Sequence, residues 1–332
     1  MTDLAIAASG LRKSYRDKKG EKVVLDGIDL AVPEGTIFSL LGPNGAGKTT
    51  TVQILSTLIR ADAGEVRVAG FDLGRQADDV RGAIGVTGQY SAVDKLLTGE
   101  ENLLLMADLK HLPKAEGRRK AKELLEKFDL VDAAGKPAST YSGGMQRRLD
   151  LAMTLVGDPR LIFLDEPTTG LDPRSRRAMW GIVRELVRDG VTIFLTTQYL
   201  EEADELADRI ALLDHGRLIA EGTAAELKAL IPGGHIELRF AGADRLDAAV
   251  RALGAGTPDP EALTLQVPSD GGVRMIRDLL TVLDDHSIEI DEMSVHTPDL
   301  DDVFLTLTGG RPDDHAAQPT GHSAGQNTEA LR

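Results

Sequence analysis

The sequence predicts an α/β protein in which a large unit around a phosphate-binding loop precedes a smaller α/β unit. Short runs rich in Val, Ile and Leu ("TIFSLL", "RLIFLDE" and "VTIFLTT") are typical of buried parallel strands, and helical patterns lie between them. The glycine-rich segment "GPNGAGKTT" lies between one of these strands and a helical pattern. A second series of strands and helices begins where the composition changes, near residues 231–234.

Composition and charge exclude several classes of protein. The 332 residues, 42% of them hydrophobic, are enough for one large domain and a smaller one. A net charge of -15 argues against nucleic acid as the main partner and against adhesion to anionic lipid, so a membrane role would act through another protein. The absence of cysteine excludes disulfides, thiolate metal sites and cysteine nucleophiles. There is no secretion signal and no apolar run near the ~18 residues of a membrane-spanning helix, so we expect a soluble, intracellular chain without direct membrane insertion.

The first half of the chain predicts strands, then helices. Residues 4–8, 23–30 and 36–41 are short apolar runs separated by turn residues, so they predict strands. Residues 48–59 predict a helix directly after the glycine-rich segment, and "GEVRVAGFDL" returns to strand. Helices dominate from about 96 to 155, because "AEGRRKAKELLEKFDL" has apolar residues at helical spacing and charges on its other face.

The second half predicts two further core strands and then the smaller unit. "PRSRRAMWGIVRELVRDG" is the expected crossover helix between "RLIFLDE" and "VTIFLTT", and a hairpin is expected around His215 and Gly216. Residues 231–309 read strand, helix, strand, helix, strand ("HIELRF", "RLDAAVRALG", "ALTLQV", "GVRMIRDLLTVLDD", "IEIDEMSV"). Residues 310–332 contain almost no large apolar residues and predict a disordered tail.

A short helix is expected at the end of the smaller unit, in "TPDLDDVFLTLTG". Thr297 is expected to cap it and Pro298 to begin it. Its apolar side chains should be buried, either against the smaller unit or against the large one: Val303, Phe304 and Leu307.

The clearest chemical motif is "GPNGAGKTT", which matches G-x-x-x-x-G-K-[ST] between a predicted strand and a predicted helix. Its glycines let backbone N–H groups converge on phosphate oxygens, Lys48 places a positive charge near the β- and γ-phosphates, and the Thr49 hydroxyl can bind Mg²⁺. An ordinary glycine-rich turn is the alternative, and the agreement of pattern and context disfavours it. The expected binding residues are Gly42, Pro43, Asn44, Gly45, Ala46, Gly47, Lys48, Thr49 and Thr50.

Two carboxylates end the apolar strand in "LIFLDEP". Asp165 is expected to hold Mg²⁺, through water, and Glu166 to orient or deprotonate the attacking water. A solvated strand end is the alternative. The phosphate loop upstream favours the catalytic reading.

A second anion cradle is predicted in "YSGGMQRR". Ser142 can cap a helix, Gly143 and Gly144 let the backbone come close to a ligand, and the first-turn N–H groups point outward. Ser-Gly-Gly alone is weak, because any junction of loop and helix can carry it. Its position, about twenty residues before "LIFLDE", makes it informative.

With Gln89 in "VTGQYSAVD", these motifs and their spacings resemble those of the ATP-binding-cassette (ABC) ATPases of membrane transporters, over roughly residues 3–225. The resemblance implies an ABC ATP-binding domain over residues 3–230, of the P-loop NTPase class. A RecA-like core, an antiparallel β subdomain and an α-helical subdomain at about residues 90–158 would make up this domain.

The resemblance also implies ATP and Mg²⁺ as ligands and a head-to-tail homodimer. Ser142 and Gly144 of one copy would contact the γ-phosphate that Lys48 of the other copy holds. Because a helix N-terminus carries about +0.5 charge, it suits an incoming phosphate. Loss of that phosphate on hydrolysis would open the dimer.

Further site residues follow from the resemblance one at a time. Tyr15 would stack on adenine, Gln89 would sense Mg²⁺ and the transporter contact, and Asp172 would couple the two sites. Gln198 stands where the family usually has histidine. Its amide can donate a hydrogen bond to the γ-phosphate but takes up no proton near neutral pH, so Glu166 would carry the base role alone or hydrolysis would be slow.

One branch of the family fits best. "VTGQYSAVD", "TYSGGMQRRLDLA", "LTTQYLEEAD" and "LDDVFLTLTG" look like the daunorubicin-resistance type of drug-export ATPase, nearly to Gly309. This implies a separately encoded permease, export of hydrophobic drugs or lipid-like metabolites, and a peripheral place at the cytoplasmic face of the cell membrane. The small domain over residues 231–309 would serve dimerisation or regulation.

Other functions fit less well. ABC ATPases of DNA repair need zinc-binding cysteines or long coiled-coil insertions, and translation-associated ones usually carry two cassettes. A GTPase would show N-K-x-D, which the sequence lacks. A purely structural role would leave Lys48, Asp165 and Glu166 without a purpose.

Overall fold

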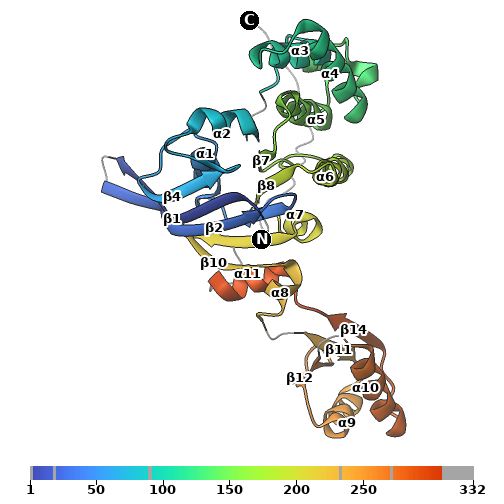
Figure 1. The fold of residues 1–332 in the computed structure, drawn as a ribbon. Helices are drawn as coiled ribbons and strands as arrows, with labels where there is room; N and C mark the ends of the chain where they lie inside the picture. Colours follow the sequence, from blue (N-terminus) through green and yellow to red (C-terminus); the bar gives the residue numbers. More distant parts are fainter. Residues whose placement is uncertain (1–2, 18–19, 89–91, 232–233, 270–271, 309–332) are drawn as a thin grey trace, which may run out of the picture.

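The structure is a computed structural model, and it confirms the predicted α/β architecture (Figure 1). Gln89 and the predicted tail lie outside the residues that it describes. Within the described ranges, no helix is both long enough and apolar enough to cross a membrane. The described ranges are 3–17, 20–88, 92–231, 234–269 and 272–308.

A six-stranded sheet forms the centre of the large unit. In spatial order its strands are β10 (Arg217–Gly222), β9 (Arg209–Asp214), β3 (Ile37–Leu41), β8 (Thr192–Thr197), β7 (Leu161–Asp165) and β6 (Ile84–Thr87). All neighbours pair in parallel except β10 and β9, which form the hairpin expected around His215 and Gly216. Every residue of β3, β7 and β8 is buried, as largely apolar parallel strands require. The carboxyl ends of these three strands meet at one edge of the sheet, where the phosphate loop begins.

Alternating side chains on the central strands supply two separate cores. Phe163 and Phe194 point to one face, where the rings of Phe38 and Phe194 stack with centroids 5.6 Å apart. Ile162 and Ile193 point to the other face. The flanking helices are α1 (Lys48–Leu55), α2 (Ala77–Ala83), α6 (Pro173–Arg188) and α7 (Leu200–Leu206).

A four-stranded antiparallel sheet, in the order β2-β1-β4-β5, packs on the first of these cores. Its two long strands extend well beyond the predicted runs of residues 4–8 and 23–30, because their polar outer halves pair in an exposed hairpin. The bounds are β1 Leu4–Asp17, β2 Gly20–Pro33, β4 Ala63–Val68 and β5 Phe71–Asp72.

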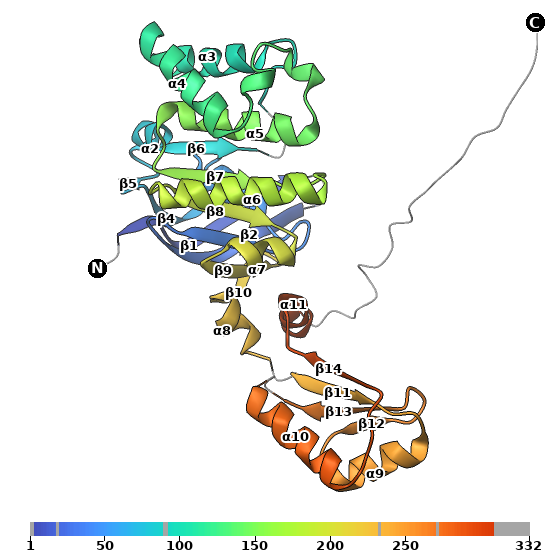
Figure 2. The same ribbon diagram turned by 90° about the vertical axis from the view of Figure 1, so that its right-hand side faces the viewer.

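The helices expected between residues 96 and 155 are confirmed. The first begins with a capping box, in which Thr98 and Glu101 each accept the other's backbone N–H. These helices lie at the end of the molecule opposite the smaller unit (Figure 2). They are α3 (Gly99–Leu109), α4 (Lys114–Lys127) and α5 (Gly143–Thr154), with short 3-10 turns at Val131–Ala133, Ala138–Thr140 and Leu155–Gly157.

The smaller unit has the split βαβ topology, with strand order β12-β13-β11-β14 and antiparallel pairing throughout. Both helices cover one face of this sheet, over a core of its own (Figure 2). The short β12 was not predicted, because "TPD" contains Pro and Asp, which disfavour strands. The elements are β11 (His235–Arg239), α9 (Ala243–Leu253), β12 (Thr257–Asp259), β13 (Thr264–Pro268), α10 (Val273–Asp285) and β14 (Glu292–His296).

The last helix, α11 (Leu300–Thr308), packs on the large unit. It contacts α8 (Ala224–Lys228) and α7, and both figures show it beside α8. Its residues Leu300 and Val303 join a core cluster that includes Leu41, the last residue of β3. The C-terminal part of the chain therefore reaches the strand from which the phosphate loop begins.

Three details of this helix were predicted wrongly. It begins at Leu300 and not at Pro298, since Asp299 and Asp302 cap it by each accepting the other's backbone N–H, at 2.9 and 3.1 Å. Thr297 precedes this cap. Val303 is buried as expected, but Phe304 is only half-buried and Leu307 is 38% exposed, because the contact surface follows Leu300 and Val303.

Candidate active site

The phosphate loop follows β3 and requires glycine at both of its ends. A Cβ on Gly42 would lie 2.2 Å from the Leu213 carbonyl oxygen, and one on Gly47 would lie 2.6 Å from Leu25 Cδ2. Gly47 also has φ of 116°, in the region that favours glycine. It precedes α1, so the free N–H groups of the first turn of that helix open into the loop.

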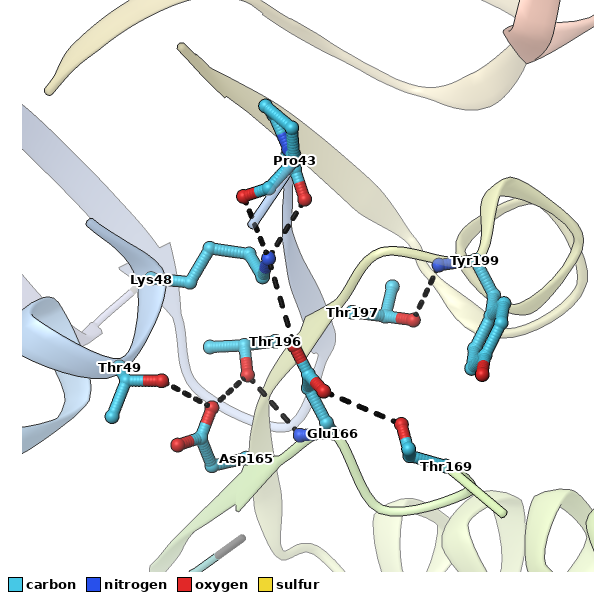
Figure 3. A network of polar contacts seen from close by, with 10 residues as sticks. Pro43, Lys48, Thr49, Asp165, Glu166, Thr169, Thr196, Thr197 and Tyr199 are labelled. Atoms are coloured by element: carbon cyan, nitrogen blue, oxygen red, sulfur yellow. Dashed lines mark hydrogen bonds and ion pairs between the residues drawn. The ribbon is translucent and has the colours of Figure 1, made fainter. Parts of the chain in front are cut away.

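Lys48 lies folded over this loop. Its ammonium donates to the carbonyl oxygens of Gly42 at 2.7 Å and Pro43 at 3.1 Å, and it lies 3.6 Å from Glu166 Oε1 (Figure 3). Burial lowers the pKa of Lys48 below its usual value, and the charges of Glu166 and Asp165 oppose that shift. The cation thus lies between the loop and the carboxylates that follow β7.

Asp165 ends β7 and is almost fully buried. Its Oδ1 accepts hydrogen bonds from the hydroxyls of Thr196 and, at 3.4 Å, Thr49 (Figure 3). Carboxylate and hydroxyl oxygens are hard donors of the kind that Mg²⁺ prefers. The pair Thr49 and Asp165 is therefore suited to a magnesium ion.

Glu166 has a strained backbone. Its φ is 48°, a conformation that costs a residue with a side chain about 1–3 kcal/mol. Its N–H donates to the Thr196 carbonyl at 3.0 Å, and its Oε2 accepts from the Thr169 hydroxyl at 3.3 Å. Such strain persists only where neighbouring groups hold it, and it is common at active sites.

Ser142 caps α5, with its Oγ accepting the Met145 N–H at 3.3 Å. Ser142 and Gly143 are exposed, so this helix N-terminus opens to solvent. Among the described contacts, none joins these residues to the phosphate loop. The structure therefore does not bring the two anion cradles of one chain together.

The Ser-Gly-Gly segment packs instead on the start of α6. A Cβ on Gly144 would lie 2.6 Å from Ser175 Oγ. Asp172 caps α6 by accepting from the backbone N–H and the hydroxyl of Ser175, at 2.9 and 2.7 Å. The hydroxyl bond is the main reason why the pKa of Asp172 lies below its usual value. Asp172 and Gly144 thus share Ser175 as a neighbour.

The remaining predicted residues lie around this centre. Tyr15 is 43% exposed on the outer hairpin, and the Lys13 ammonium lies over its ring, 5.5 Å from the ring centroid. Gln198 is half-buried directly after β8. Within the loop, Asn44 is exposed, Thr50 is half-buried and Ala46 is buried.

Two charged residues near the site, one buried and one largely buried, were not predicted. Arg147 donates to the carbonyls of Asp165 and Pro167, on either side of Glu166. Glu202 accepts from Trp180 and the Thr168 hydroxyl, and burial raises its pKa. The i,i+3 pairing of Arg147 with Asp150 was a visible signal, but "LEEADEL" does not tell which glutamate is buried.

Comparison with known proteins agrees with this geometry. The sequence profile of the ABC transporter family matches residues 25–169. The chain is 50% identical to the daunorubicin resistance ATP-binding protein DrrA3 of Streptomyces coeruleorubidus, over 93% of this chain and 97% of that protein. It is 47% identical to the daunorubicin/doxorubicin resistance protein DrrA of Streptomyces peucetius, over 95% of each chain.

A solved structure with 28% identity is similar as well, with a TM-score of 0.60 over 66% of this chain and 98% of the other. That structure is a dimeric ATP-binding cassette in a post-hydrolysis state, bound to ADP and Pi. The family and the branch that the motifs indicated are both confirmed. The chain belongs to the ATP-binding proteins of ABC transporters, in the branch of the daunorubicin and doxorubicin resistance ATP-binding proteins, and it is an ATPase.

Proposed function

We propose that the chain drives a separate membrane permease that exports hydrophobic drugs or lipid-like metabolites. It works as a homodimer, bound peripherally at the cytoplasmic face of the cell membrane. The names of the relatives support the cargo class, since they are resistance proteins for daunorubicin and doxorubicin. The single observation that carries the dimer is the separation of two anion cradles on one chain, each at a helix N-terminus.

The roles of the loop residues follow from their positions. Backbone N–H groups of residues 42–50 and the Lys48 ammonium bind the β- and γ-phosphates of ATP. Thr49 and Asp165 hold Mg²⁺, which neutralises phosphate charge when it is bound. Lys48 exchanges its bonds with the carbonyls of Gly42 and Pro43 for phosphate oxygens.

Glu166 orients the attacking water and accepts its proton. The carboxylate lies 3.6 Å from the Lys48 ammonium, at the edge of the sheet where the phosphate loop opens. Gln198 donates a hydrogen bond to the γ-phosphate and takes no proton, so Glu166 acts without a neighbouring base. Tyr15 stacks on adenine.

The second copy completes each site. Ser142, Gly143 and Gly144 of one subunit contact the γ-phosphate held by Lys48 of the other. Asp172 couples the two sites, because Ser175 links it to Gly144 in the same chain. Gln89 senses Mg²⁺ and the permease.

The two domains have different roles. The ATP-binding domain spans residues 3–230, with a helical subdomain at about 90–158, and the domain over residues 231–309 serves dimerisation or regulation. Its last helix shares a core cluster with Leu41, the last residue of β3, and the phosphate loop begins directly after that strand.

Trapping the ATP-bound dimer tests this function. The variant Glu166→Gln keeps the shape of the site and removes the base, so with ATP and Mg²⁺ it should accumulate as a dimer in light scattering. Lys48→Ala is the matched control and should remain monomeric, because it lacks the phosphate contact. A Glu166→Gln protein that stays monomeric at saturating ATP and Mg²⁺ would refute the proposal.

A further inference from the structure

Arg147 makes an unusual set of contacts next to the site. Its side chain is only 10% exposed and extends from α5 to the end of β7. Nε donates to the Pro167 carbonyl at 2.8 Å, and Nη2 donates to the Asp165 carbonyl at 3.2 Å. These two carbonyls belong to the residues on either side of Glu166.

The same guanidinium also holds the segment that follows β6. Nη1 donates to the Gly88 carbonyl at 2.9 Å and to Asp150 Oδ2 at 3.2 Å. Asp150 lies one turn further along α5, is 3% exposed in its side chain, and accepts the Ala92 N–H at 2.9 Å. One buried ion pair therefore ties α5 to both Gly88 and Ala92.

Burying an ion pair costs desolvation free energy. Such a pair is therefore expected where it makes contacts that apolar residues could not make. Burial lowers the pKa of Arg147, and the carboxylates of Asp150 and Asp165 oppose that shift. Apolar residues of similar volume would often hold a helix equally well. What they could not do is donate to three backbone carbonyls at once, which the rigid fork of five N–H groups allows.

We propose that Arg147 is a positioning residue for hydrolysis, which holds the strained backbone of Glu166 in its productive conformation. The φ of 48° at Glu166 persists only under external constraint, and the carbonyls on both sides of it are fixed by this one side chain. Arg147 lies five residues after Ser142 on the same helix. This inference rests on the proposed base role of Glu166.

The test compares Arg147→Lys with Arg148→Lys. Lysine keeps the positive charge, but its single ammonium cannot reach the separate carbonyls to which the planar guanidinium of arginine donates. Arg148 is a matched control, because it lies on the same helix but donates to Phe128 and Asp129, in the helical region. Arg147→Lys should lower kcat about tenfold or more with KM for ATP changed less than about threefold, whereas Arg148→Lys should leave both near the wild-type values.

A merely structural role gives other results. If Arg147→Lys raised KM with kcat unchanged, or if both variants lowered kcat equally, the positioning role would be wrong. If Arg147→Lys does not fold, the double variant Arg147→Gln with Asp150→Asn removes both buried charges together, and it should show the same loss of kcat.

A second readout separates this inference from the proposed function. In the Glu166→Gln background, Arg147→Lys should still form the ATP-trapped dimer, because it affects the chemical step and not nucleotide binding. Failure of Glu166→Gln alone to dimerise would count against the proposed function. Failure of only the combined variant would overturn the positioning role.

Discussion

Replacing Leu300 with alanine should detach α11 from the large unit without unfolding the protein. Leu300 is 2% exposed and packs with Leu227 and Ile231 in the cluster that includes Leu41. Loss of a buried leucine typically costs about 2–5 kcal/mol. The helix has nine residues and too little local stability to persist alone, so this loss falls mainly on its docking.

Hydrogen exchange of the α11 amides measures that docking directly. A loss of about 2 kcal/mol corresponds to exchange about thirtyfold faster, with the rest of the large unit unchanged. Leu307→Ala is the matched control on the same helix, since Leu307 is 38% exposed, and it should leave exchange nearly unaltered. Equal exchange in the two variants would show that α11 is not held by Leu300, and the reasoning from burial would fail.

Three further predictions concern the site. Gly144→Ala should lower ATP turnover, because its Cβ would lie 2.6 Å from Ser175 Oγ, and turnover at the wild-type rate would contradict this. Burial raises the pKa of Glu202 above the unfolded value of 4.5, so its stabilising contribution is full below pH 4.5 and is lost as pH rises through the folded pKa. The melting temperature of Glu202→Gln relative to wild type should therefore increase from pH 4.5 to pH 8, and a flat difference would refute the burial argument. Turnover should show no inflection near pH ~6.5 that depends on Gln198, so one that disappears in Gln198→Ala would contradict the account.

Local features of the site could be predicted from the sequence because their residues are adjacent in the chain. The phosphate loop, the two carboxylates after β7 and the Ser-Gly-Gly segment each combine a motif with its own strand or helix. Gly42 illustrates the limit, because its need for glycine comes from the Leu213 carbonyl, which lies far away in the sequence.

Features that depend on tertiary contacts were missed. The i,i+3 spacing of Arg147 and Asp150 sets Arg147 apart from Arg148, but it does not show that Arg147 reaches the carbonyls around Glu166. The end of the chain shows the same limit. Asp299 and Thr297 are both good capping residues, so the sequence alone does not choose between them. In the structure Leu300 packs on the large unit, and Asp299, directly before it, caps α11.

The central claim is that each ATP pocket is shared between two copies of the chain. Heterodimers purified through two different tags, both copies carrying Glu166→Gln, can be tested for retained ATP. With Lys48→Ala on one copy and Ser142→Arg on the other, one pocket stays whole, and one ATP should be retained per dimer. With both changes on the same copy, both pockets are broken and no heterodimer with bound ATP should be recovered. The reverse pattern would show that each chain forms its pocket alone and would contradict the account.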